Sequence, residues 1–253
     1  MRNRLSIIGW MSLAIPFLTL AQPKPRSTNT YTSSIDGVVA QVADGGSWKT
    51  IITLVNVDKT VGAYVIKFYA DNGSPLTLPT TAGTSSTIAG TLPLNGSVVI
   101  ETAGTAAALS QGWALVTATN YMAGNAIFRQ SVSGRPDFEA SMPITSYLED
   151  NDYFLPFDNI TSSASVAILN PLSYKTITVS VTFRDQQGNQ FYSDSFTLGP
   201  LAHTAFSLPQ RYPPSQGHLG VVEFKTPDPA LSMLGLRFGA VSFTSILPLT
   251  PGL

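Results

Sequence analysis

The chain has 253 residues, of which 43% are hydrophobic and only 11% are charged, and it contains no cysteine. This composition excludes intrinsic disorder, a collagen-like fold and a small scaffold held together by disulfides. The length is sufficient for one or two domains that each bury a core of their own.

The net charge and the scarcity of ligand-forming residues narrow the functional classes. A formal net charge of −1 gives no broad positive field, so we expect no nucleic-acid partner. The lack of cysteine excludes thiol nucleophiles, thiolate zinc sites and a lipoprotein anchor. The two histidines, His203 and His218, have a spacing that matches no metal or acid–base motif. We expect ordinary strand or surface histidines, and a shared histidine site is the alternative.

Residues 1–21 have the pattern of a secretory signal peptide. Arg2 and Arg4 precede an apolar stretch, Leu5 to Leu20, and Thr19-Leu20-Ala21 has the small-x-small form of a cleavage site. An uncleaved anchor is the alternative, but the stretch is short for a membrane span, which needs about 20 apolar residues. We therefore expect a secreted or periplasmic protein with no membrane span after cleavage.

The rest of the chain predicts an all-β fold. Residues 22–34 are rich in Pro, Ser and Thr, which predicts an extended tether. From Ile35 onward, runs rich in Val, Ile, Thr, Phe and Tyr are separated by turn residues about every ten positions, as is typical of β-sandwiches. In the clearest run, 176–184, apolar and polar residues alternate, which predicts one buried and one solvent-facing side. No segment has the pattern of an amphipathic helix.

The strand-like runs of the first half of the chain recur in the second half. We therefore predict two tandem immunoglobulin-like β-sandwich domains after the signal peptide, at residues 35–145 and 153–253, joined by a linker at 146–152. The matched positions are Phe68 with Phe183, Gly73 with Gly188, Thr53–Asn56 with Ala167–Asn170, Leu92–Ser97 with Leu198–His203, and Ser110–Gly112 with Ser215–Gly217.

Several short motifs spread along the chain have a combined pattern that is specific for one family. They are Val42–Trp48, Asp71–Leu76, Ile127–Gln130, Gly134–Asp137, Leu155–Asn159, Gly235–Phe238 and Phe243–Ile246. At these residues the chain resembles a family of exported bacterial proteins of unknown function that are built from paired immunoglobulin-like all-β repeats. The resemblance implies export and a paired all-β fold. It implies no particular activity, ligand or catalytic residue.

Two groups of residues are candidates for ligand binding. Trp48 and Trp113 lie outside the signal peptide, and exposed tryptophans of β-sandwich modules bind sugar rings by stacking. Both lie in strand-like runs, so packing in the core is the alternative that the pattern favours. Arg135 and Asp137 belong to the polar segment 134–139, which we expect to form a long loop; its length and polarity make it a candidate binding surface, and an ordinary surface loop is the alternative that the pattern favours.

An acidic segment at the predicted domain junction is the candidate cation site. Glu149, Asp150 and Asp152 offer carboxylate oxygens, which calcium prefers as ligands. The segment has no EF-hand spacing, so a solvated polar linker is the alternative. We predict no other cofactor.

Four further side chains have a structural interpretation. Arg129 and Arg237 lie near the ends of late strands, and we expect each guanidinium to pair with a carboxylate such as Asp71 or Asp185. Asn56 and Asn170 end their strands, where their amides are expected to bind backbone groups of the following loops.

The sequence contains none of the motifs of serine hydrolases, zinc proteases or nucleotide-binding loops. We therefore predict a non-enzymatic exported adhesion, scaffold or surface-binding module whose partner is unknown, with an extracellular glycan and an envelope protein as the candidates. The alternative is a carbohydrate-binding protein that uses exposed aromatic residues, with or without calcium. An enzyme based on two carboxylates stays open, because sequence cannot place acids from separate strands at the spacing this chemistry needs.

Overall fold

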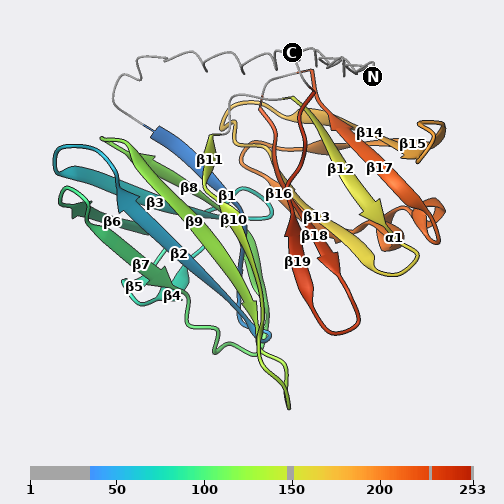
Figure 1. Cartoon of the computed structure of the whole chain (residues 1–253). Helices are drawn as coiled ribbons and strands as arrows, with labels where there is room; N and C mark the ends of the chain where they lie inside the picture. Colours follow the sequence, from blue (N-terminus) through green and yellow to red (C-terminus); the bar gives the residue numbers. More distant parts are fainter. Residues whose placement is uncertain (1–34, 147–150, 228–229, 252–253) are drawn as a thin grey trace, which may run out of the picture. The chain divides into compact units, whose positions relative to one another are not determined.

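The computed structural model describes residues 35–146, 151–227 and 230–251, which belong to one compact unit, Ser33–Leu253. The predicted signal peptide and tether, and residues 147–150 of the predicted linker, lie outside the described residues. Within the described residues, no helix is long and apolar enough to cross a membrane. The described chain is all-β, as predicted (Figure 1).

Residues 35–146, here called the first half, form two main antiparallel sheets and one small sheet. Sheet A has the order β11-β1-β8-β3-β6, sheet B has the order β10-β9-β2-β7, and β4 pairs with β5. The strands are β1 (Ile35–Asp44), β2 (Trp48–Asn56), β3 (Gly62–Ala70), β4 (Leu78–Thr80), β5 (Gly83–Ser85), β6 (Thr87–Leu92), β7 (Ser97–Glu101), β8 (Ser110–Ala118), β9 (Met122–Gln130), β10 (Phe138–Pro143) and β11 (Thr145–Ser146).

Residues 151–251, here called the second half, also form two antiparallel sheets. Sheet D has the order β12-β17-β14-β15, and sheet E has the order β16-β13-β18-β19. The elements are β12 (Asp152–Asp158), β13 (Ser163–Leu169), β14 (Ile177–Asp185), β15 (Gln190–Leu198), β16 (His203–Ser207), the short helix α1 (Leu208–Arg211), the 3₁₀ turn η1 (Pro213–Ser215), β17 (Leu219–Lys225), β18 (Ser232–Phe238) and β19 (Phe243–Ile246).

The two halves have the same strand order. In sheet A, β1, β8, β3 and β6 are neighbours, and in sheet D the order is β12, β17, β14 and β15. Sheets B and E match in the same way, with β2 and β13 at corresponding central positions. The correspondence extends to side chains, because Asn56 at the end of β2 and Asn170 directly after β13 make the same contacts.

Each of these asparagines is fully buried and joins three segments of its own half. Asn56 Nδ2 donates to the carbonyl oxygens of Thr60, Leu92 and Pro93 at 2.7, 3.0 and 3.2 Å. Asn170 Nδ2 donates to the carbonyls of Lys175, Leu198 and Gly199 at 2.7, 3.2 and 2.8 Å. In both cases Oδ1 accepts from the backbone N–H two residues later, at 3.0 Å. The predicted role of Asn56 and Asn170 is confirmed.

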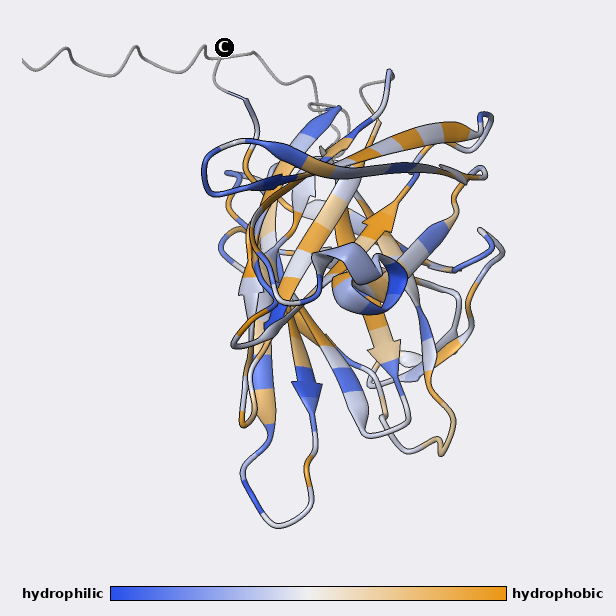
Figure 2. Ribbon diagram, turned by 90° about the vertical axis from the view of Figure 1, so that its right-hand side faces the viewer, coloured by the Kyte–Doolittle hydropathy of each residue, from blue (hydrophilic) through white to orange (hydrophobic). Residues whose placement is uncertain are grey.

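The strands differ in how many of their sides are buried. Along β14, Val179, Val181 and Phe183 are buried while the residues between them are more exposed, which confirms the predicted alternation. Figure 2 shows apolar and polar residues alternating in this way along several strands. In contrast, β13 is buried on both sides: Val166 and Ile168 pack in the core of the second half, whereas Ala167 and Leu169 pack with the core of the first half. Sheet E is therefore covered on both faces.

Candidate functional site

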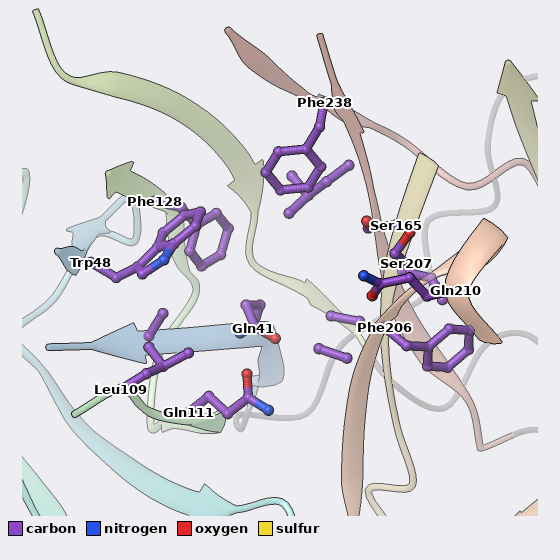
Figure 3. A pocket seen from close by; sticks show the side chains of 15 residues that line it. Gln41, Trp48, Leu109, Gln111, Phe128, Ser165, Phe206, Ser207, Gln210 and Phe238 are labelled. Atoms are coloured by element: carbon purple, nitrogen blue, oxygen red, sulfur yellow. The ribbon is translucent and has the colours of Figure 1, made fainter. Parts of the chain in front are cut away.

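A cleft of about 290 Å³ lies where sheet E of the second half meets strands of the first half. Strands β1, β2, β8 and β9 contribute one wall, and β13, β16, α1 and β18 contribute the other. The lining residues are Gln41, Ala43, Trp48, Leu109, Gln111, Phe128, Ser165, Val166, Ala167, Ala205, Phe206, Ser207, Gln210, Leu236 and Phe238 (Figure 3). The cleft combines apolar walls with several polar side chains.

Small residues on sheet E give the cleft its depth. Ser165 lies opposite Ser207 across the β13–β16 pair, and Ala167 lies opposite Ala205. Because these side chains are short, they leave open space in front of this part of sheet E. Gln210, from α1, reaches toward the same space in Figure 3.

The side-chain amide of Gln111 has a fixed orientation. Its Nε2 donates to Asp71 Oδ2 at 2.9 Å. A carboxylate only accepts hydrogen bonds, so the nitrogen of the amide must face Asp71, and Oε1 is left on the cleft side. Figure 3 shows the amide groups of Gln111 and Gln41 turned toward each other.

Asp71 is itself held by a residue of the other half. Its Oδ1 accepts a hydrogen bond from His203 Nδ1 at 2.8 Å, and the His203 side chain is fully buried. The backbone N–H of His203 also donates to the Asp71 carbonyl at 2.9 Å. Burial acts to raise the pKa of Asp71, but the hydrogen bonds from His203 and Gln111 outweigh it, so the pKa lies below its ordinary value. Asp71 therefore stays ionised and keeps Gln111 oriented.

Gln41 supplies a buried acceptor without a partner. The residue is only 9% exposed, and its Oε1 has no hydrogen-bond partner. Its Nε2 donates to the Val42 carbonyl over a long distance, 3.5 Å. Buried polar atoms are nearly always satisfied, and an exception in the wall of a cleft indicates a place where a bound molecule or water supplies the missing donor.

The two candidate tryptophans have different environments. Trp48 is half-buried, lines the cleft and packs against Phe243 with ring centroids 5.4 Å apart. Trp113 is fully buried, stacks on Tyr69 at 4.8 Å and donates from Nε1 to the Leu201 carbonyl at 2.8 Å. Trp113 therefore joins the two halves and has no free face for a ligand, whereas Trp48 borders open space.

The predicted loop and arginine residues lie away from the cleft lining. Arg135 lies over the ring of Phe138 at 4.1 Å. Asp137 is 3.9 Å from Arg129, and Arg129 pairs more closely with Glu139, at 2.7 Å. The expectation that Arg129 and Arg237 each pair with a carboxylate is confirmed, but the partners are Glu139 and Asp158 and not the suggested Asp71 or Asp185. Arg129 and Glu139 lie opposite each other in the β9–β10 pair, whereas Arg237 of β18 reaches Asp158 at the end of β12, in the other sheet of its half.

The corresponding pair in the second half is Arg237 with Asp158, at 3.5 Å. Hydrogen bonds from Thr161 and from the backbone of Thr161 and Ile160 hold the pKa of Asp158 at about 2. This carboxylate is therefore ionised across the physiological range and closes the turn after β12.

The predicted calcium residues are only partly within the described chain. Glu149 and Asp150 lie outside the described residues. Asp152 Oδ2 accepts from Lys225 Nζ at 2.5 Å. Across residues 35–146, 151–227 and 230–251, no group of three or more His, Asp or Glu side chains is arranged to hold a metal ion.

The two histidines make different contacts and form no shared site, as expected. His203 binds Asp71, while His218 stacks on Phe191 with centroids 4.8 Å apart. Sequence reasoning missed Gln41, Gln111 and Gln210. A signal for Gln41 was present, because it is the one polar residue in the run Val38–Ala43, but nothing in the sequence places Gln111 or Gln210 beside it.

None of the residues that line the cleft within the described chain is ionisable. The site therefore combines aromatic surface, small residues and amide groups in a neutral pocket. Comparison of the chain with family models, with curated proteins and with solved structures finds no match.

Proposed function

We propose that this chain is a non-enzymatic, exported surface-binding module, and that the cleft between its two halves is the ligand site. One observation supports this proposal most directly: a buried acceptor, Gln41 Oε1, has no partner in the wall of a cleft lined by neutral side chains. Pockets for small ligands are typically apolar with a few fixed polar groups, and this lining has that composition.

The neutral lining favours binding over catalysis. General acid–base and nucleophilic mechanisms require a titratable or activated group within hydrogen-bond reach of the reacting atoms. The serines of the cleft, Ser165 and Ser207, have no base beside them among the lining residues, and Asp71, the carboxylate that holds Gln111, is engaged by Gln111 and His203. Export is supported by the signal-like sequence of residues 1–21.

Each half is proposed to be an immunoglobulin-like sandwich with two strands exchanged. In an immunoglobulin sandwich, strands B and E share one sheet, and strands C and F share the other. The pairs β2–β7 and β3–β8 correspond to these strands. In that fold the first strand, A, lies in the sheet of B and E, and the seventh strand, G, lies in the sheet of C and F. Here β1, in the place of A, pairs with β8, and β9, in the place of G, pairs with β2. The first and last strands have therefore exchanged sheets.

A screen of neutral compounds tests the proposed function. Ligand-observed NMR of the full chain with a library of sugars, nucleosides, amides and aromatic compounds is expected to detect binders. Ser165→Trp fills the cleft and should remove their signals, while Ile51→Trp, at the corresponding position of β2, should leave them unchanged. Binding that survives Ser165→Trp, no binder at all, or chemical turnover of any binder would overturn the proposal.

A further inference from the structure

We propose that the ligand of the cleft is a neutral pyranose unit, which rests against Trp48 and donates hydroxyl groups to Gln41 Oε1 and Gln111 Oε1. This inference rests on the proposed function and names its ligand class. It is carried by the orientation of the two amides, by the neutrality of the lining and by the half-buried indole.

The two amide oxygens require hydrogen-bond donors from the ligand. Gln111 Oε1 faces the cleft because Nε2 is held by Asp71, and Asp71 is in turn held by the buried His203. Gln41 Oε1 is buried and unpartnered. Figure 3 shows the two amides converging, so a ligand with adjacent hydroxyl groups can satisfy both at once.

The lining discriminates against anionic ligands. A carboxylate or phosphate would meet two carbonyl-type oxygens, and Asp71 lies directly behind Gln111, so an anion would be repelled from this wall. No residue of the lining carries a positive charge to compensate. Acidic sugars are therefore excluded, whereas neutral hydroxyl groups fit.

The remaining walls suit the ring of a sugar. Trp48 presents a half-buried indole, and aromatic faces bind the apolar C–H face of pyranose rings. Phe243 packs against Trp48 and limits its movement. On the opposite wall, Ser165, Ser207 and the Gln210 amide offer further polar groups to hydroxyls on the other side of the ring.

The size of the cleft sets the length of the bound segment. A volume of about 290 Å³ lies just below the usual range for ligand pockets, roughly 300 to 1,000 Å³. This is room for one or two sugar units, so longer glycans are expected to bind through a terminal unit.

Isothermal titration of the full chain tests the inference. The probes are the methyl pyranosides of glucose, galactose, mannose and N-acetylglucosamine, their β-1,4-linked disaccharides where these exist, and methyl glucuronide as the acidic comparison. At least one neutral probe should bind. Gln41→Met and Gln111→Met should each weaken its binding about tenfold, the effect of losing one hydrogen bond, and Trp48→Ala should abolish it.

Gln216→Met is the control, because Gln216 is exposed and lies outside the lining of the cleft. It should bind the probe as the unchanged protein does. The inference is overturned if methyl glucuronide binds as well as its neutral counterpart, or if the glutamine variants keep full affinity. If no sugar binds, but another neutral compound binds the unchanged protein and not the Ser165→Trp variant, the inference fails and the proposed function stands. If nothing binds in the cleft, both fail.

Discussion

The outer faces of sheets B and E occupy the same position in their respective halves but differ in chemistry. On sheet B, Lys49 pairs with Glu101 and Arg129 pairs with Glu139, and Val99 is 55% exposed. On sheet E, the corresponding face carries small or apolar residues that are covered by the first half: Ala167, Leu169, Leu234 and Leu236. Two sheets with the same strand order therefore have different outer faces: that of sheet B faces solvent, and that of sheet E forms the interface between the halves.

This difference in chemistry matches the burial of the two faces. In repeat proteins, an interior face is apolar and a terminal face is polar. Sheet E docks on the first half with uncharged side chains, whereas the ion pairs of sheet B would have to be desolvated if another copy docked there. The charged residues of sheet B therefore suit a face that stays in contact with solvent, and the cleft forms where the interface between the two halves is incompletely filled.

Reversing the chemistry of one outer face should have the largest effect. Ala167→Arg places a charge in the buried interface, and we expect a loss of about 3–5 kcal/mol in the free energy of unfolding. Thr53→Arg makes the same change at the matched position of sheet B, which is half-exposed, and should cost about 0.5 kcal/mol or less. Urea unfolding of both variants checks the comparison, and equal losses would contradict it.

The conserved geometry of the two asparagines predicts equal effects in the two halves. Asn56→Ala and Asn170→Ala each leave three buried or part-buried carbonyls without their donor. Each should lower the free energy of unfolding by about 2–3 kcal/mol. Denaturant unfolding measures both. If only one of the two variants lowers the free energy of unfolding, the prediction of equal effects is contradicted.

Substitutions at two matched turn glycines, Gly73 and Gly188, distinguish the cost of backbone strain from the cost of disturbing the contact between the two halves. Gly73 and Gly188 both have φ of 83°, but a Cβ on Gly73 would lie 2.4 Å from the Pro200 carbonyl, while nothing lies within 4 Å of one on Gly188. Gly188→Ala should cost about 1 kcal/mol from the left-handed backbone alone. Gly73→Ala should cost about 1–2 kcal/mol more, because the loops of the two halves must move apart. Thermal unfolding tests this, and equal costs would argue against a tight contact.

The smallest predicted effect concerns the titration of Asp71. Because its pKa is lowered in the folded state, Asp71 stabilises the fold above its ordinary value of 3.8, and this contribution is lost as pH falls through the lower folded value. His203→Phe removes one hydrogen bond but keeps the burial, so the pKa of Asp71 should rise. The pKa of Asp185, lowered mainly by Asn189 in its own turn, should not change. Carboxyl carbon NMR during a pH titration measures both, and an unchanged Asp71 would contradict the coupling.

The sequence was informative where one side of a strand faces solvent. The alternation in 176–184 predicts β14, because a polar residue at every second position has only one physical explanation. The matched turns and asparagines also indicated the repeat. The apolar residues of β13 are nearly continuous, which indicates a strand buried on both faces, but periodicity cannot show what covers each face. This run was the sequence signal for the interface between the two halves.

The candidate site was predictable only in part. Trp48 was identified from its residue type, but Gln41, Gln111 and Gln210 come from β1, β8 and α1, and their proximity depends on how sheet E docks. The role of Gln111 depends on two further residues, Asp71 and His203, from different halves. No local pattern encodes such a relay, because each hydrogen bond joins segments far apart in sequence.

The most direct test of the account is chemical-shift mapping on the full chain. Spectra of the ¹⁵N-labelled protein would be recorded with increasing amounts of the neutral methyl pyranoside that binds most tightly. The account predicts that the indole signal of Trp48 and the side-chain amide signals of Gln41, Gln111 and Gln210 shift together and saturate. Shifts confined to the loop that carries Arg135 and Asp137, or to the outer face of sheet B, would contradict the claim that the cleft is the binding site.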